Sequence, residues 1–223
     1  MSTLNATELQ VVASPQQTEA EYVRAQVEAR VRAALDEAMA RPSQEIAEPA
    51  GWWNLYAIGP IQIPASPLPP AAPLLPHQVI KVGETAYVAN VMVLNPFQIV
   101  NGITNAATIL SNFALPYTIR YQAGNLTTWT LGQANMNVVR SGVGYNLVPG
   151  QFVYVDILAF TATTPGIYEM NVSVEINGAT PPYTNAPQFA GYARAVVDVD
   201  PELFVGGAPG LQFDQPIRFQ IYP

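Results

Sequence analysis

The stretch LVPGQFVYVDILAFTATTPGIYEMNVSVEING, from Leu147 to Gly178, holds the pattern that decides the fold. Residues 151–161 form one run of apolar, β-branched and aromatic side chains, and residues 167–177 alternate strictly between apolar and polar positions. Alternation with a period of two is typical of a β-strand with one buried face. Between the runs, Thr163-Thr164-Pro165-Gly166 supplies the fixed φ and the glycine freedom of a tight corner. We therefore predict two strands joined by a corner.

Tyr168 lies just inside the second of these strands, and Met170 follows two positions later. This arrangement resembles the E–F corner of bacterial-type immunoglobulin-like β-sandwich modules, where a tyrosine hydrogen-bonds back across the turn and a core residue follows. Met170 stands where an antibody domain has its second cysteine. The resemblance covers only the stretch quoted above, and it implies an immunoglobulin-like sandwich with Tyr168 as the corner tyrosine.

Composition limits the partners of the chain. Among 223 residues, 9 Lys and Arg stand against 16 Asp and Glu, which gives a net charge of −7, and Lys81 is the only lysine. Without a basic stripe, nucleic acid and anionic membrane surfaces are not expected partners. Only 11% of residues are charged and 49% are hydrophobic, whereas soluble domains carry about 25% charged residues. We infer that much of the surface is covered by another segment or another chain.

The first residues and the missing cysteines bear on the compartment. Residues 1–10 show neither the positive nor the apolar region of a signal peptide, and no run approaches the roughly 20 apolar residues of a membrane span. We expect cytoplasmic synthesis without membrane insertion, and incorporation into a surface or virion assembly stays open. The chain contains no cysteine, which excludes disulfides and thiolate chemistry.

Before the predicted sandwich, the sequence divides into a polar tail (1–14), an amphipathic helix (15–41) and a Trp/Pro-rich extended arm (42–76). Ser14-Pro15 and the pair Thr18 and Glu21 are helix-start signals, and Arg41-Pro42 ends the helix. The helix carries one stripe of small apolar residues, which packs either on its own β domain or on a helix of another copy. Seven prolines between positions 60 and 76 predict polyproline II chain with apolar side chains.

From residue 77 to the C-terminus we predict an all-β domain, an immunoglobulin-like antiparallel sandwich of seven to nine strands. Two predicted strands are apolar on both faces, with Asn90 and Asp156 as the lone exceptions, whereas a simple sandwich needs one apolar face per strand. The second face must be covered by the helix, the arm or a neighbouring subunit. The residues predicted to make this assembly interface are Val23, Val27, Val31, Trp52, Trp53, Tyr56, Ile61, Ile63, Phe152, Tyr154, Leu158 and Phe160.

The sequence offers little that points to catalysis, so we predict no enzymatic activity, no catalytic residue and no cofactor. His77 is the only histidine and is interpreted as a surface residue. Asp198, Asp200 and Glu202 are weak candidates for a metal site, because carboxylates around a strand end can bind calcium. Their interpretation as a solvated strand end is favoured, and no metal is assigned. Glycoside hydrolysis would need two opposed carboxylates, for which Asp156 with Glu169 or Glu175 is conceivable.

Two hypotheses for function follow. The first is a non-enzymatic structural subunit that forms a homo-oligomer, filament or shell, with the helix and arm docking between subunits. The alternative is a β-sandwich module that binds a carbohydrate or a protein, with Trp129, Tyr117 and Tyr121 available to stack on sugar rings. Oligomeric state separates the two.

Overall fold

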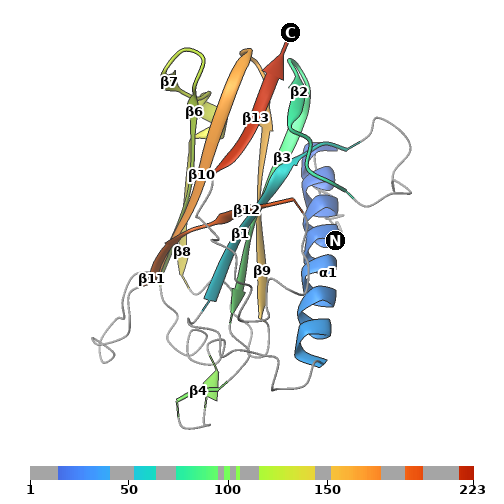
Figure 1. Cartoon of the computed structure of the whole chain (residues 1–223), viewed down its shortest axis with the longest axis vertical. Helices are drawn as coiled ribbons and strands as arrows, with labels where there is room; N and C mark the ends of the chain where they lie inside the picture. The colour runs from blue at the N-terminus through green and yellow to red at the C-terminus, as the bar shows by residue number, and fades with distance from the viewer. Residues whose placement is uncertain are drawn as a thin grey trace, which may run out of the picture.

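The protein is a β-sandwich with one helix packed on its side, as Figure 1 shows for this computed structural model. Helix α1 (Pro15–Ala40) is followed by strands numbered β1 to β13 in chain order. The helix begins at the predicted residue and ends one residue before the predicted position 41, and Glu28 and Arg32, one turn apart, form an ion pair at 2.6 Å. The structure describes residues 15–40, 53–63, 74–94, 98–100, 104–105, 116–143, 152–176, 189–197 and 216–223.

One layer is a four-stranded sheet in the order β12-β1-β3-β9. Strand β3 (Thr85–Leu94) pairs antiparallel with both β1 (Trp53–Ile61) and β9 (Val153–Thr161). Strand β12 (Arg194–Val196) pairs with β1 in parallel. The sandwich is therefore not antiparallel throughout, because β12 reaches β1 by a crossover from the other sheet and not through a hairpin.

The second layer is a seven-stranded sheet with the central order β2-β13-β10-β6-β7. Strand β10 (Gly166–Ile176) lies at its centre between β13 (Ile217–Tyr222) and β6 (Pro116–Asn125). Further along the same strands, β11 pairs with β10 and β8 pairs with β6. The remaining elements are β2 (Val79–Lys81), β7 (Thr130–Leu131), β8 (Val138–Val143), β11 (Phe189–Tyr192), the 3-10 helix η1 (Ala134–Met136) and a small hairpin of β4 (Gln98–Val100) and β5 (Thr104–Asn105).

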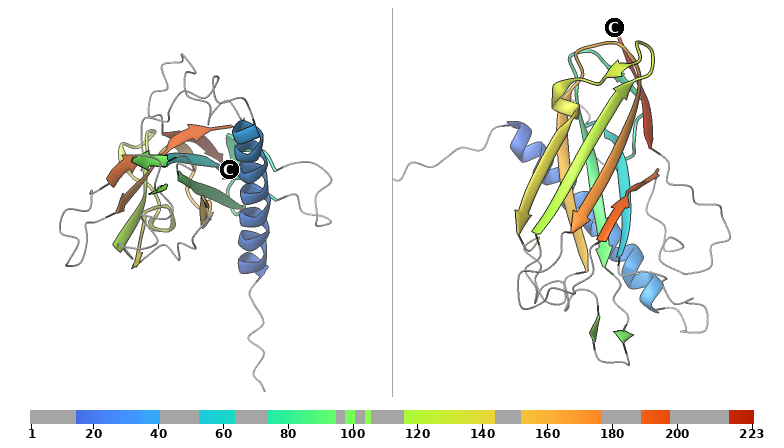
Figure 2. Two further views of the ribbon diagram at one scale, coloured as in Figure 1. Left: turned by 90° about the horizontal axis from the view of Figure 1, so that it is seen from below. Right: turned by 90° about the vertical axis from the view of Figure 1, so that its left-hand side faces the viewer.

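The predicted fold class, an all-β immunoglobulin-like sandwich with an N-terminal helix, is confirmed by these two sheets. Figure 2 shows the seven-stranded sheet on one side and α1 on the opposite side of the molecule, against the four-stranded sheet. The strands outnumber the seven to nine predicted, because short pieces such as β5, with 2 residues, could not be recognised from alternation. Two apolar cores result, one between the sheets and one beneath α1.

The corner between β9 and β10 has the predicted geometry. The Tyr168 hydroxyl donates to the carbonyl of Thr164 at 2.9 Å, four residues upstream, and the Tyr168 side chain is buried. Met170, two positions on, is fully buried in the inter-sheet core, as its interpretation as a core residue requires. The ring of Tyr168 stacks on Phe219 of β13 with centroids 5.6 Å apart. This hydrogen bond is the tyrosine corner of immunoglobulin-like sandwiches.

The sandwich begins earlier than predicted, because residues 53–61 form β1 and not part of an extended arm. Leu55 and Ala57 enter the inter-sheet core, while Tyr56 and Ile58 enter the core beneath α1. The sequence favoured an extended arm here because Pro60 cannot donate a ladder hydrogen bond. In the structure, Pro60 lies at the end of β1, where the register with β3 shifts between Ile58 and Ile61. Such an irregularity tolerates proline, which the regular part of a ladder does not.

The chain between residues 189 and 196 passes from one sheet to the other. Strand β11 pairs with β10 in one sheet and β12 pairs with β1 in the other. At the crossing, the Ala193 amide donates to the Val172 carbonyl at 2.8 Å. Alternation continues through the crossing, so sequence periodicity gives no sign of the switch.

Candidate interaction surfaces

Helix α1 covers the outer face of the four-stranded sheet within the same chain. Val23, Val27 and Val31 are at most 2% exposed. They pack in the core beneath the helix with the odd-numbered residues of β3 and β9 and with one face of β1. The apolar stripe of the helix therefore meets its own β domain in this structure, and the doubly apolar strands need no second chain to bury them. The sheet residues in this core are Tyr56, Ile58, Ile61, Tyr87, Ala89, Val91, Val93, Val153 and Ile157.

Polar contacts help to fix α1 on this face. The Tyr87 hydroxyl donates to a carboxylate oxygen of Glu19, and Arg30 Nη1 donates to the Leu74 carbonyl at 2.9 Å. Burial raises the pKa of the Tyr87 hydroxyl, and the hydrogen bond to Glu19 and the negative charge of Glu19 raise it further. Burial likewise raises the pKa of Tyr56 to about 12, against a smaller opposing effect of Arg194. Both tyrosines therefore stay neutral under the helix.

The other predicted interface residues divide between the two cores. Tyr154, Leu158 and Phe160 are buried between the sheets, and half-buried Phe152 packs against both cores. Ile63 is half-buried beside the core under α1. Trp52 and the side chain of Trp53 lie outside the described residues. The predicted interface residues are thus apolar side chains that must be shielded from water. Those that the structure describes are packed in the two cores of the same chain.

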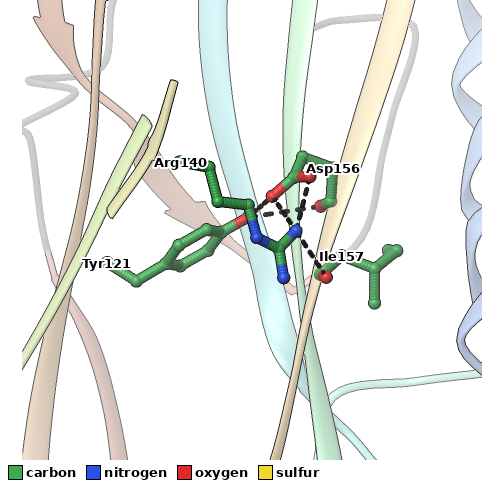
Figure 3. Close-up of polar contacts among 4 residues, drawn as sticks. All are labelled: Tyr121, Arg140, Asp156 and Ile157. Carbon is green, nitrogen blue, oxygen red and sulfur yellow. Dashed lines mark hydrogen bonds and ion pairs between the residues drawn. The ribbon is translucent and has the colours of Figure 1, made fainter. Parts of the chain in front are cut away.

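The two polar exceptions of the doubly apolar strands face the space between the sheets. Figure 3 shows Asp156 of β9 with Arg140 of β8 and Tyr121 of β6. Arg140 Nη1 lies 2.6 and 2.7 Å from the two carboxylate oxygens of Asp156, and the Tyr121 hydroxyl donates to Oδ2 at 2.7 Å. Asn90 is the cross-strand neighbour of Asp156, is 1% exposed, and its Oδ1 has no hydrogen-bond partner among the described residues. This inter-sheet polar cluster ties one sheet to the other.

Side chains from the second sheet also cap the free edge of β9. Arg140 Nη1 donates to the Ile157 carbonyl at 2.9 Å, and Asn135 Nδ2 of η1 donates to the Thr161 carbonyl at 2.9 Å. A strand edge with satisfied carbonyls is a poor template for pairing with another chain. Sequence reasoning missed this role of Arg140 and Asn135, because nothing local links these residues to β9.

The carboxylates considered for hydrolysis do not converge. Asp156 points between the sheets, whereas Glu169 and Glu175 lie on the outer face of β10. There they pair with Arg218 at 3.0 Å and with Arg120 at 2.6 Å. Asp198, Asp200 and Glu202 lie outside the described residues. Among the residues that are described, no three His, Cys, Asp or Glu side chains gather as they would around a metal ion.

His77 is exposed, as interpreted, and lines an open pocket of about 510 Å³ near the first turns of α1. Glu19, Glu84 and Tyr87 share its lining, but Glu84 already accepts from Gln62 Nε2 at 2.7 Å and Glu19 from Tyr87. In the described part of the chain, no helix is long and apolar enough to span a membrane.

The aromatic residues proposed for sugar stacking are separated in space. Tyr121 is buried in the core between the sheets and Tyr117 is half-buried, whereas Trp129 is 87% exposed in the turn between β6 and β7. Leu131 is 85% exposed and Ile167 is 50% exposed at the same end of the sandwich. We call Trp129, Leu131 and Ile167 the apolar tip. The sequence signalled Trp129 as an exposed aromatic, but not its neighbours.

No protein-family model and no curated protein matches this chain. Among solved structures, the CARDB domain of the PF1109 protein from Pyrococcus furiosus is similar in two determinations. The crystal structure, a complex with di-metal ions, is 16% identical, covers 65% of this chain and 87% of that domain, and has a TM-score of 0.28. The solution structure is 15% identical, covers 66% and 96%, and has a TM-score of 0.27. An ASH/PapD-like domain of human CEP192 is 12% identical, covers 60% and 97%, and has a TM-score of 0.25.

These TM-scores are low, so the description of the fold rests on the strand pairing and the tyrosine corner. The class that the fold defines is an immunoglobulin-like β-sandwich module with an N-terminal helix as a third layer.

Proposed function

We propose that the chain is a non-enzymatic structural subunit that assembles with copies of itself, using the N-terminal helix as an exchangeable cover of the sheet. The observation that carries the proposal is the core beneath α1. The helix, at one end of the chain, covers an apolar sheet face that requires a cover, and any second copy offers an identical face. Exchange of such an element is a low-cost route to dimers.

The length of the chain between helix and sheet permits this exchange. Residues 41–52 connect α1 to β1, and a segment of that length spans about 40 Å when extended. Most of the contact consists of apolar side chains, and these would make the same contacts on the sheet of a neighbour. The contacts between α1 and the sheet are therefore equivalent within one chain and between two, and protein concentration sets the balance.

The described ionisable groups also support a structural role. Asp156, Glu169 and Glu175 are each engaged by an arginine, and Glu19 accepts from Tyr87. Groups that hold the sandwich together in this way are not arranged around a common reaction centre.

Crosslinking between single-cysteine chains tests the exchange. Because the chain has no native cysteine, only the introduced cysteines react with the crosslinker. Arg30 contacts the Leu74 carbonyl, and the adjacent Leu75 is exposed. Chains carrying only Arg30→Cys and chains carrying only Leu75→Cys are unfolded together, refolded at high concentration and treated with a short bismaleimide. We expect a mixed dimer on denaturing gels.

Two controls accompany this experiment. A chain with both cysteines must crosslink internally, and Arg32→Cys, on the opposite side of the helix, must not crosslink to Leu75→Cys. If the double variant crosslinks internally and the mixture of single variants gives no dimer at any concentration, the helix covers only its own sheet and the proposed exchange is wrong.

A further inference from the structure

We propose that the apolar tip is a second docking surface, on which another copy of this chain binds through the same patch. The inference rests on the proposed self-assembly and adds to it a contact that the helix does not make. Trp129 and Leu131 are the two most exposed large apolar side chains in the described part of the chain. The strand register brings Leu131, Gly124 and Glu169 side by side across β7, β6 and β10, so that Gly124 leaves Leu131 unshielded.

The tip is held in place by a hydrogen-bond network and is not a loose loop. Asn125 Oδ1 accepts from the amides of Thr127 and Thr128 at 2.9 and 3.3 Å, and Asn125 Nδ2 donates to the corner hydroxyl of Tyr168 at 3.2 Å. The amide of Ile167 donates to the Thr127 hydroxyl at 2.9 Å. Surface that is ordered before binding loses less conformational entropy when a partner docks.

The backbone at Trp129 is unusual. Its φ is 57°, in the left-handed region that residues other than glycine, asparagine and aspartate rarely adopt. A bulky residue is therefore held in a costly conformation at the point where its side chain is most exposed. Backbone strain of this kind clusters at functional surfaces.

Charge favours a second copy as the occupant. Copies that each carry a net charge of −7 repel one another over most of their surface. Residues 121–139 and 157–168, which form the ends of both hairpins at the tip, contain no Asp, Glu, Lys or Arg. The neighbouring Glu169 is neutralised by Arg218 at 3.0 Å. Two copies can meet through these uncharged segments without desolvating or opposing a charge, while the Glu169–Arg218 pair and the neighbouring β2–β3 turn, with Lys81 and Glu84, lie at a polar rim.

The size of the patch predicts a weak contact. Trp129 contributes on the order of 200 Å² and the three side chains about 400 Å² per copy, which is below the roughly 800 Å² per partner of a stable interface. We therefore expect association in the micromolar to millimolar range for single chains. If helix exchange joins two copies, each dimer presents two tips, and isologous contacts between tips then extend the assembly into a linear chain.

The test uses the full chain in sedimentation velocity from micromolar to millimolar concentration. Trp129→Gly removes the aromatic anchor and also relieves the φ of 57°. We expect association to weaken by about tenfold or more while the melting temperature stays the same or rises. A loss of association by unfolding would lower the melting temperature, so the two readouts separate docking from folding.

A charge exchange tests whether the contact is between identical patches. Leu131→Asp and Leu131→Lys chains should each associate less than wild type, and an equal mixture of the two should recover association at low salt. Val197→Asp, at a residue that is 66% exposed and directly follows β12 of the four-stranded sheet, should associate like wild type. Wild-type association of Trp129→Gly, or a mixture that recovers nothing, would overturn the inference.

The outcomes also separate this inference from the proposed helix exchange. Mixed dimers in the crosslinking experiment together with unaffected tip variants would leave the exchange intact and remove the tip contact. Weakened association of the tip variants, together with an absence of mixed dimers in the crosslinking experiment, would overturn the proposed helix exchange alone. Sugar-dependent quenching in wild type but not in Trp129→Gly, without concentration-dependent sedimentation, would identify the tip as a glycan surface and overturn the inference.

Discussion

Asp156→Asn should destabilise the sandwich more than the loss of any ion pair on its outer surface. The substitution keeps the shape of the side chain, but it removes the charge that accepts from Arg140 at 2.6 and 2.7 Å. It also turns an amide NH₂ towards donors, since Tyr121 and Arg140 both donate to this carboxylate.

The magnitude follows from the exposure of the pair. Hydrogen bonds to a charged group contribute about 1.5–3 kcal/mol each. The Asp156 side chain is 18% exposed, but that of Arg140 is 37% exposed, so solvent recovers part of the loss. We expect the free energy of unfolding to fall by about 2 kcal/mol, which lowers the melting temperature of a chain of this size by about 4–8 °C. Urea denaturation followed by circular dichroism measures the first quantity and calorimetry the second.

Glu175→Gln is the matched control. Glu175 pairs with Arg120 at the same 2.6 Å, but both side chains are at least 33% exposed on the outer face of the seven-stranded sheet. Exposed pairs contribute about 0–1 kcal/mol. If Glu175→Gln costs as much as Asp156→Asn, the position of the Asp156 pair between the sheets does not determine its contribution, and the reasoning is refuted. An Arg140→Met double-mutant cycle should give a coupling energy of about 1–2 kcal/mol with Asp156.

Three further predictions concern the core beneath α1 and the unpaired amide oxygen of Asn90. Val27→Ala should lower the free energy of unfolding by about 1–2 kcal/mol, whereas Gln26→Ala, at an exposed position one residue away, should change it by less than about 0.5 kcal/mol in urea denaturation. Asn90→Val, which removes an unpaired buried oxygen, should be neutral or raise the melting temperature, and a clear loss would show that the amide has a partner. Burial raises the pKa of Tyr56 in the folded state to about 12, from the ordinary value near 10. The neutral hydroxyl therefore contributes about 3 kcal/mol to the free energy of unfolding below pH 10, and this contribution is lost as the pH rises towards 12. Tyr87 acts in the same direction, so Tyr87→Phe should move the alkaline unfolding midpoint, followed by tyrosinate absorbance, to higher pH.

Sequence reasoning succeeded where structure is decided locally. The β9–β10 corner needs a proline, a glycine and alternating strands within a few residues of one another, and all of these are visible in the sequence. The helix likewise has its own start and stop signals and an apolar stripe. The doubly apolar strands also revealed that a third layer exists, although they did not reveal that the chain's own helix supplies it in this structure.

The failures share a physical cause, because each depends on contacts between distant parts of the chain. Pro60 is tolerated in β1 only because the pairing with β3 becomes irregular at that point. Asp156 has a charged partner between the sheets only because β8 of the opposite sheet brings Arg140 to it. Tyr121 and Trp129 were grouped because both are aromatic and near in sequence, yet β6 turns the first inward and the turn after it directs the second outward.

Several edges and faces of the described sandwich are protected against nonspecific association. Side chains from the other sheet cap the free edge of β9, and β2 and β12 are edge strands of only 3 residues each. Ion pairs occupy the outer face of β10 on the seven-stranded sheet, and the helix covers the apolar face of the four-stranded sheet. Strand-to-strand association is therefore disfavoured at these sites. The two contacts proposed above, the exchange of the helix and the apolar tip, lie outside these protected sites. A reciprocal exchange of the helix closes at a dimer, and so does an isologous contact between two tips, so only the two contacts together would extend an assembly without limit.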